Sequence, residues 1–185
     1  MGKSTTAQLF AEFGCAVWDA DAAVHRLYAK GGDAVAPMAE IFPQAIKDGA
    51  VSRDALRKII SDQPDALRKI EAIVHPLVAQ DRAAFLERAP SAIVVLDIPL
   101  LFETNSQDHF DAVACVTVPE NIQRDRVLSR GTMTAQQFEQ IRAKQMPNDE
   151  KCSRADFVIV TDTVEHARAQ VHSVINQIRQ RLGNA

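Results

Sequence analysis

The sequence lacks a run of apolar residues approaching the roughly 18 that a membrane-spanning helix requires. It does not open with the positively charged and then apolar stretch of a secretory signal. Internal repeats and low-complexity linkers are absent too. We therefore expect a globular protein of the cytoplasm with no membrane partner.

Cysteine is scarce and is not arranged for metal binding. Cys15, Cys115 and Cys152 are far apart in the chain, odd in number, and form no CxxC pair. Cys15 and Cys115 lie within or beside apolar runs, which favours small buried side chains in a reducing compartment. The five histidines show no metal-ligand spacing either.

An excess of charge of one sign is also missing, since 21 basic residues stand against 24 acidic ones. Nucleic-acid-binding proteins usually present a basic face, so we expect no nucleic-acid partner, although a local basic pocket for phosphates remains compatible with this balance. With 185 residues, 46% of them hydrophobic, the chain is long enough for one domain with a real core. Nothing in the composition indicates an oligomeric state.

Apolar runs and helical patterning alternate along much of the chain and predict an α/β fold. The runs at 92–97, 112–118 and 157–160 are apolar on both faces, which is typical of strands in a parallel sheet. A shorter run at 15–18 predicts one more strand. The middle of the chain, about 33–88, shows only helical patterning, interrupted at His75-Pro76 because proline cannot donate to the preceding turn. The other predicted helices cover 3–13, 22–30, 120–129, 134–145 and 164–182.

Gly2-Lys3-Ser4-Thr5 directly precedes the first predicted helix and matches the end of the Walker A pattern G-x-x-x-x-G-K-[ST]. In that loop backbone amides hold phosphates at a helix N-terminus, the lysine reaches the β- and γ-phosphates, and the hydroxyl binds Mg²⁺. We predict that these four residues bind ATP, with Lys3 also catalytic and Ser4 a metal ligand. A tripeptide of this kind arises by chance in roughly one such chain in ten, and the alternative is a solvated helix start with an exposed Lys3.

The first half of a Walker A loop, and the strand that leads into it, would lie before Met1. We therefore expect the central strand of the sheet, between 92–97 and 112–118, to be missing from this chain. Unpaired buried strand edges are costly, so we expect the chain as written to be poorly soluble or inactive.

Asp19 and Asp21 follow the predicted strand 15–18, where ligands bind in open parallel sheets. Alternate residues of a strand share a face, so both carboxylates could bind a substrate hydroxyl and help to hold Mg²⁺. The alternative is a structural pair in which Asp21 caps the next helix.

Two further features fit a phosphotransferase. Asp97 ends an apolar strand, as the Mg²⁺-orienting acid of a Walker B strand does, although many buried strands end in Asp. Arg126 and Arg130 are spaced i, i+4 on one helical face and are predicted to contact ATP phosphates. Their alternative is a solvated face with Asp125 as a local partner.

Together these segments resemble the dephospho-coenzyme A kinase family over essentially the whole chain. The matching segments are GKST (2–5), WDADAAVHRL (18–27), IEAIVHPLV (70–78), VLDIPLLFE (95–103), Q-x-x-R-x-x-x-R (123–130) and QMPNDEKCSRADFVI (145–159). The resemblance implies transfer of the ATP γ-phosphate to the ribose 3′-hydroxyl of dephospho-CoA, the last step of coenzyme A synthesis, with Mg²⁺ accompanying ATP.

The resemblance also implies a fold and residue roles. Asp21 matches the catalytic carboxylate, and the substrate-binding residues would be Asp19, Asp21, His25, His75 and Pro76. The implied fold is a P-loop NTPase-type parallel sheet flanked by helices, a single domain over 1–185. Its parts would be a core (1–30, 91–119 and 152–185), a helical substrate-binding insert (about 31–90) and a helical lid (about 120–151).

The chain departs from the family pattern at two further places. Gly131 stands where the family usually has an acid or an amide, and Thr161-Asp162-Thr163 replaces Asn-x-Gly near the adenine loop. Backbone groups could still contact adenine there. Two alternatives stay open, namely another small-metabolite kinase of the same fold, or a degenerate P-loop protein without catalysis.

Overall fold

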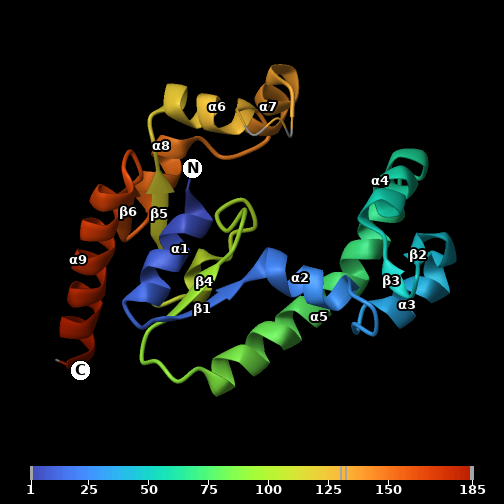
Figure 1. Cartoon of the computed structure of the whole chain (residues 1–185), viewed down its shortest axis with the longest axis horizontal. Helices are drawn as coiled ribbons and strands as arrows, with labels where there is room; N and C mark the ends of the chain where they lie inside the picture. Colours follow the sequence, from blue (N-terminus) through green and yellow to red (C-terminus); the bar gives the residue numbers. More distant parts are fainter. Residues whose placement is uncertain (1, 130, 132, 184–185) are drawn as a thin grey trace. The chain divides into compact units, whose positions relative to one another are not determined.

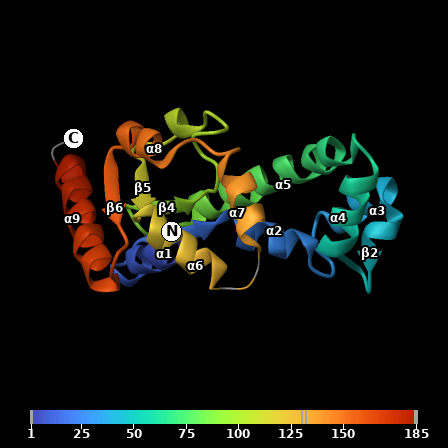
Figure 2. The same ribbon diagram turned by 90° about the horizontal axis from the view of Figure 1, so that it is seen from above.

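The computed structural model describes residues 2–129, 131 and 133–183, and Figures 1 and 2 show their helices and strands in two views. The chain divides into two compact units. Unit 1 comprises Met1–Val17 and Asp97–Ala185, and unit 2 comprises Trp18–Leu96. The division into core, insert and lid remains a prediction.

Unit 1 is built around two parallel strands, β5 (Ala114–Thr117) and β6 (Phe157–Val160), which pair along their whole length. Helix α9 (Val164–Gly183) packs against β6 and against α1 (Lys3–Glu12), as Figure 1 shows. The contacting side chains are the apolar ones that helical and strand periodicity place inward. The fully or almost fully buried ones are Leu9, Ile159, Val171 and Ile175.

In the described part of the chain between β5 and β6, three short helices follow one another in sequence. They are α6 (Glu120–Leu128), α7 (Ala135–Arg142) and α8 (Asn148–Arg154). A reciprocal capping box between Thr134 and Gln137 begins α7. The sequence predicted α6 and a longer α7 but missed α8, whose seven residues are too few to show a helical period. A 3-10 helix, η2 (Gln107–His109), precedes β5.

Unit 2 is mainly helical and has its own apolar core. Its elements are α2 (Ala20–Tyr28), α3 (Val35–Ile41), η1 (Pro43–Ala45), β2 (Ile46–Lys47), β3 (Ala50–Val51), α4 (Arg53–Asp62) and α5 (Ala66–Arg88). Helix α5 contacts α2, α3 and α4. The core cluster includes Leu27, Met38, Phe42, Leu56, Ile59, Ile70 and Val74.

A small antiparallel hairpin corrects the prediction that the middle of the chain is helical only. Strands β2 and β3 pair with Ile46 opposite Val51, and Asp48 and Gly49 form the turn between them. Both turn residues have positive φ, 52° and 80°. An Asp-Gly turn with positive φ at both residues is a strong hairpin signal, so the sequence carried this information.

The predicted interruption at His75-Pro76 is also wrong, because α5 runs unbroken from Ala66 to Arg88 with Pro76 inside it. Proline removes one hydrogen bond and crowds the preceding turn. The apolar face nevertheless continues across the proline. Ile70 and Val74 before it belong to the core, and Leu77 and Val78 after it are partly buried and pack against that core. Packing of that face compensates for the lost bond.

The two remaining strands are β1 (Ala16–Asp19) and β4 (Val94–Asp97), which pair with each other. Among the described strands, β1 and β4 form one two-stranded sheet and β5 and β6 form another, with no hydrogen-bonded pairing between the two sheets. The expectation of a missing central strand remains untested. In the described part of the chain, no helix is long and apolar enough to cross a membrane.

Candidate active site

Gly2 shapes the start of α1, where the sequence predicts the phosphate loop to end. It has a positive φ of 84° and forms the N-cap. A Cβ at this position would lie 3.3 Å from Thr161 Oγ1. The Gly2 carbonyl accepts hydrogen bonds from the amide of Thr6 (2.9 Å) and from its hydroxyl (3.0 Å). Only glycine combines this backbone conformation with such a close approach at low cost.

Lys3, Ser4 and Thr5 form the exposed first turn of α1, and the ammonium group of Lys3 contacts Asp97 Oδ1 at the end of β4. The Asp97 side chain is buried, whereas 44% of the Lys3 side chain is exposed. The second carboxylate oxygen, Asp97 Oδ2, is buried and has no hydrogen-bond partner among the described residues. An unsatisfied buried acceptor costs about 1–3 kcal/mol, so this oxygen favours a bound cation or donor.

Ser4 and Asp97 fit the Mg²⁺ site that the sequence predicts. Both offer the hard oxygen atoms that Mg²⁺ prefers, and Mg²⁺ is commonly held by one or two carboxylates together with substrate phosphates and water. In the described part of the chain, no group of three or more His, Cys, Asp or Glu side chains could enclose a metal. A metal held mainly by nucleotide phosphates needs no such cluster.

In unit 2, Asp19 rather than Asp21 caps α2. The Asp19 Oδ1 atom accepts a hydrogen bond from the Ala22 amide at 2.6 Å. Capping by Asp21, the alternative left open by the sequence, is therefore wrong. Asp21 lies in the first turn of α2 and is exposed, so its carboxylate is accessible to a substrate.

The other predicted substrate residues lie on two helices of the same unit. His25 is exposed on α2, and His75 and Pro76 are exposed on α5. Because α2 packs against α5, the structure places these residues on neighbouring elements. Their roles remain predictions.

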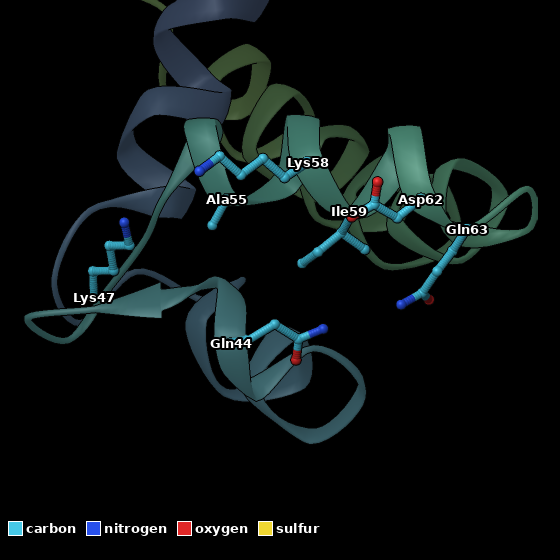
Figure 3. A pocket seen from close by; sticks show the side chains of 7 residues that line it. All are labelled: Gln44, Lys47, Ala55, Lys58, Ile59, Asp62 and Gln63. Carbon is cyan, nitrogen blue, oxygen red and sulfur yellow. The ribbon is translucent and has the colours of Figure 1, made fainter.

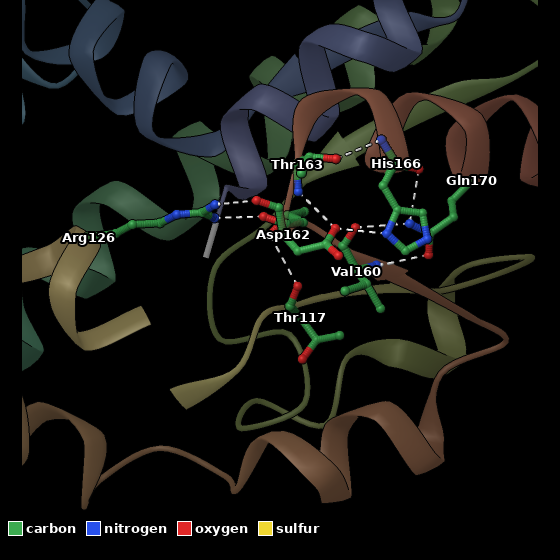
Figure 4. A network of polar contacts seen from close by, with 8 residues as sticks. Thr117, Arg126, Val160, Asp162, Thr163, His166 and Gln170 are labelled. Carbon is green, nitrogen blue, oxygen red and sulfur yellow. Dashed lines mark hydrogen bonds and ion pairs between the residues drawn. The ribbon is translucent and has the colours of Figure 1, made fainter. Parts of the chain in front are cut away.

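Arg126 of α6 is half-buried and binds the loop that follows β6, as Figure 4 shows. Its guanidinium donates to the carbonyls of Thr161 (2.7 Å) and Asp162 (2.9 Å). The Asp162 carboxylate in turn accepts from the Thr163 amide and pairs with His166, each at 2.8 Å. The Thr163 amide, and secondly His166, hold the pKa of Asp162 below its ordinary range.

The contact between Arg126 and ATP therefore stays a prediction, because the described hydrogen bonds of Arg126 do not test it. Arg126 is engaged with backbone carbonyls rather than standing free on a solvated face. Arg130, the second predicted ATP ligand of the lid, lies outside the described residues.

Sequence reasoning missed an ion pair between Glu103 and Lys151. Their charged atoms are 2.6 Å apart, and the two side chains are only 17% and 14% exposed. The Met146 amide also donates to Glu103, at 3.1 Å. Burial raises the pKa of Glu103, but Lys151 and this amide more than offset it, so the pKa lies below its ordinary value. Glu103 and Lys151 both belong to segments that carry the family resemblance. This shared membership was the only feature of the sequence that could have pointed to the pair.

Two of the three free cysteines are in contact. The Sγ atoms of Cys115 on β5 and Cys152 on α8 lie 3.5 Å apart. Burial, and secondly the neighbouring Cys152, raise the pKa of Cys115 to about 12.

An open cavity of about 370 Å³ lies beside α4 in unit 2 (Figure 3). Its lining consists of Gln44, Lys47, Ala55, Lys58, Ile59, Asp62 and Gln63. None of these lining residues is a predicted site residue.

The profile of the dephospho-CoA kinase family matches residues 1–166. The chain belongs to that family. It is 65% identical over 179 residues to a dephospho-CoA kinase of Ruegeria pomeroyi, covering 97% of this chain and 91% of the relative. A dephospho-CoA kinase of Cereibacter sphaeroides is 58% identical over 180 residues, with the same two coverages. The family prediction is therefore confirmed.

Solved structures agree with the predicted fold class. The crystal structure of TT1252 from Thermus thermophilus superposes with a TM-score of 0.82 at 29% identity, covering 95% of this chain and 91% of that one. Dephospho-CoA kinase from Campylobacter jejuni, at 22% identity, shares the fold with a TM-score of 0.71 over 100% of this chain and 94% of that one. The prediction of an α/β fold of the P-loop kinase type is confirmed.

Proposed function

We propose that this protein phosphorylates the ribose 3′-hydroxyl of dephospho-CoA with ATP, giving coenzyme A and ADP. The 65% identity to a dephospho-CoA kinase over nearly the whole chain supports this activity. The observation that carries it is the pairing of Lys3, at the start of α1, with the buried Asp97, at the end of β4. A lysine and an acid so placed are the charged parts of a P-loop phosphate site.

ATP phosphates would bind at the N-terminus of α1. The first amides of a helix have no partner within it and attract anions, and Gly2, Lys3, Ser4 and Thr5 occupy this position. Lys3 would exchange Asp97 for the phosphates as ATP binds. Mg²⁺, when bound by Ser4 and Asp97, would neutralise charge on the phosphates.

Asp21 is the proposed general base. The 3′-hydroxyl oxygen attacks the γ-phosphorus, the bond from that phosphorus to the β–γ bridging oxygen breaks, and the hydroxyl proton passes to the Asp21 carboxylate. Phosphoryl transfer of this kind needs positioning and charge stabilisation rather than a covalent intermediate. Asp21 suits the role because its side chain is exposed and because Asp19, not Asp21, makes the capping hydrogen bond of α2.

The remaining predicted contacts complete the proposal. Asp19, His25, His75 and Pro76 would line the substrate side. Arg126 and Arg130 would reach the ATP phosphates, and Arg126 would have to release the carbonyls of residues 161 and 162 to do so. A location in the cytoplasm is proposed from the cysteine pattern.

Replacing Asp21 by Asn tests the proposal. This change keeps the shape but removes the charge and basicity, and general-base contributions are typically 10²–10⁴-fold. We expect turnover, measured as dephospho-CoA-dependent ADP release, to fall by that order, while ATP binding by calorimetry is retained. Asp65→Asn, which changes an exposed aspartate of the same unit, is the matched control. Turnover of Asp21→Asn within about threefold of the parent would remove Asp21 from the base role.

A further inference from the structure

Three side chains of unit 2 meet at one carboxylate oxygen beside the Asp19–Asp21 segment. Asp81 Oδ2, on α5, accepts a hydrogen bond from the indole Nε1 of Trp18 at 2.8 Å. The same oxygen accepts one from the guanidinium of Arg26 at 2.6 Å. Neither Trp18, Arg26 nor Asp81 is among the predicted site residues.

These contacts tie both sides of the proposed catalytic segment to α5. Trp18 immediately precedes Asp19, which ends β1 and caps α2. Arg26 lies in the last turn of the same helix, whose first turn carries Asp21. Because the strand end and the helix share one anchor, Asp21 cannot shift along α5 without breaking a contact to Asp81.

Both bonds depend on the Asp81 carboxylate. Trp18 is 3% exposed, so its indole N–H would be buried without an acceptor if Asp81 were lost, and such a group is costly. Arg26 is 55% exposed and could turn to water, but the charge-assisted bond fixes its geometry. The burial of Trp18 therefore makes Asp81 a constraint on the strand end.

We propose that Asp81 is a positioning residue, which sets the place of the Asp21 carboxylate relative to α5 through Trp18 and Arg26. The proposal rests on the proposed function, because it takes Asp21 as the base and α5, with His75 and Pro76, as part of the substrate side. Asp81 itself touches neither reactant in this scheme. Its effect should thus appear in turnover and not in nucleotide binding.

Asp81→Ala and Trp18→Phe test this directly. The first change removes the carboxylate that accepts both hydrogen bonds, and the second removes the indole N–H but keeps a buried ring. A displacement of a reacting group by about 1 Å can lower the rate by the order of 10²-fold, so we expect kcat to fall about 10- to 100-fold in each variant. The KM for ATP should stay within about twofold. The double variant should lose no more than Asp81→Ala alone, because Asp81→Ala already removes the acceptor of the Trp18 hydrogen bond.

Asp54→Asn is the matched control, since it removes an exposed Asp–Arg pair of the same unit, Asp54 with Arg57 at 2.8 Å. We expect its kcat to equal that of the parent. Trp18 is the only tryptophan in the sequence, so its indole N–H gives one resolved NMR signal. That signal should exchange slowly with solvent in the parent and faster in Asp81→Ala, which has no acceptor at this position.

The outcomes separate this inference from the proposed function. A parent protein without dephospho-CoA-dependent ADP release would overturn both. An active parent with an equally active Asp81→Ala variant, or with a Trp18 signal unchanged in that variant, would overturn the positioning role alone. Urea titrations measure how much of each variant is folded. If the loss of kcat only matched the loss of folded protein, and if the effects in the double variant were additive, Asp81 would have a structural role and no positioning role.

Discussion

Lys3 and Asp97 are separated by 94 positions in the chain and form an ion pair between the start of α1 and the end of β4. The two partners are unequal, because the Asp97 side chain is buried and that of Lys3 is nearly half exposed. A charge left alone in water costs little, whereas a charge left alone in the interior keeps its desolvation cost without a compensating attraction. Loss of the ion pair should therefore cost more free energy at Asp97 than at Lys3.

This asymmetry predicts unequal effects on stability. Lys3→Met leaves the buried Asp97 carboxylate without its counter-charge, and we expect the free energy of unfolding to fall by about 1–3 kcal/mol. Asp97→Asn leaves only a half-exposed lysine and should destabilise the protein less. Urea titrations measure both, with the exposed Asp111→Asn as control. An equal or larger loss in Asp97→Asn would contradict the asymmetry.

Arg126 provides a second prediction, for ATP binding. Arg126→Ala frees the carbonyls of Thr161 and Asp162 and removes the proposed phosphate contact. We expect kcat/KM for ATP to fall at least tenfold, since removing one preorganised charged donor typically costs 10²–10³-fold in rate. Arg124→Ala changes an exposed arginine two positions away on α6 and should have no effect. Equal rates in both variants would limit the role of Arg126 to its contacts with the loop after β6.

The sequence predicted the elements whose signal is local. The run 157–160 is β6 with the same bounds, and the alternation of strands and helices gave the fold class. The unbroken α5 could not be predicted, because the packing that compensates for Pro76 comes from other helices. The hairpin at Asp48-Gly49 was predictable from its turn but was obscured by the surrounding helical pattern.

The candidate site divides in the same way. Gly2, Lys3, Asp21 and Asp97 were found because their motifs are contiguous in the sequence. Asp81 was not, since 63 positions separate it from Trp18 and neither residue belongs to a phosphate-binding pattern. Contacts between side chains that are far apart in the chain leave no trace in the periodicity of one sequence.

Cys115 and Cys152 should differ in reactivity although their sulfur atoms are 3.5 Å apart. The thiolate is the reactive form, and the pKa of Cys115 is raised to about 12, first by burial. At pH 8 Cys115 is therefore almost entirely in the unreactive thiol form. We expect an alkylating reagent to modify the half-buried Cys152 first, and Cys115 only after unfolding. Peptide mass spectrometry over time measures both rates, and comparable rates in the folded protein would contradict the prediction.

The ion pair of Glu103 with Lys151 predicts a dependence of stability on pH. The pKa of Glu103 lies below its ordinary value of 4.5, because Lys151 and the Met146 amide outweigh the effect of burial. A carboxyl with a lowered pKa in the folded state stabilises the protein fully above its unfolded pKa, and this contribution is lost as the pH falls through the folded pKa.

Glu103→Gln removes that contribution. We expect the variant to be less stable than the parent by about 1.5–3 kcal/mol at pH 7, the range for hydrogen bonds to charged groups. The difference should stay constant down to about pH 5, near the ordinary pKa of glutamate, and shrink below it, because protonation then disables the pair in the parent too. Urea titrations between pH 7 and pH 3 measure this difference.

Glu139→Gln, at an exposed glutamate 3.8 Å from Arg142, should differ little from the parent at any pH. A difference for Glu103→Gln that did not shrink in acid would show that its cause is the shape of the side chain rather than its charge.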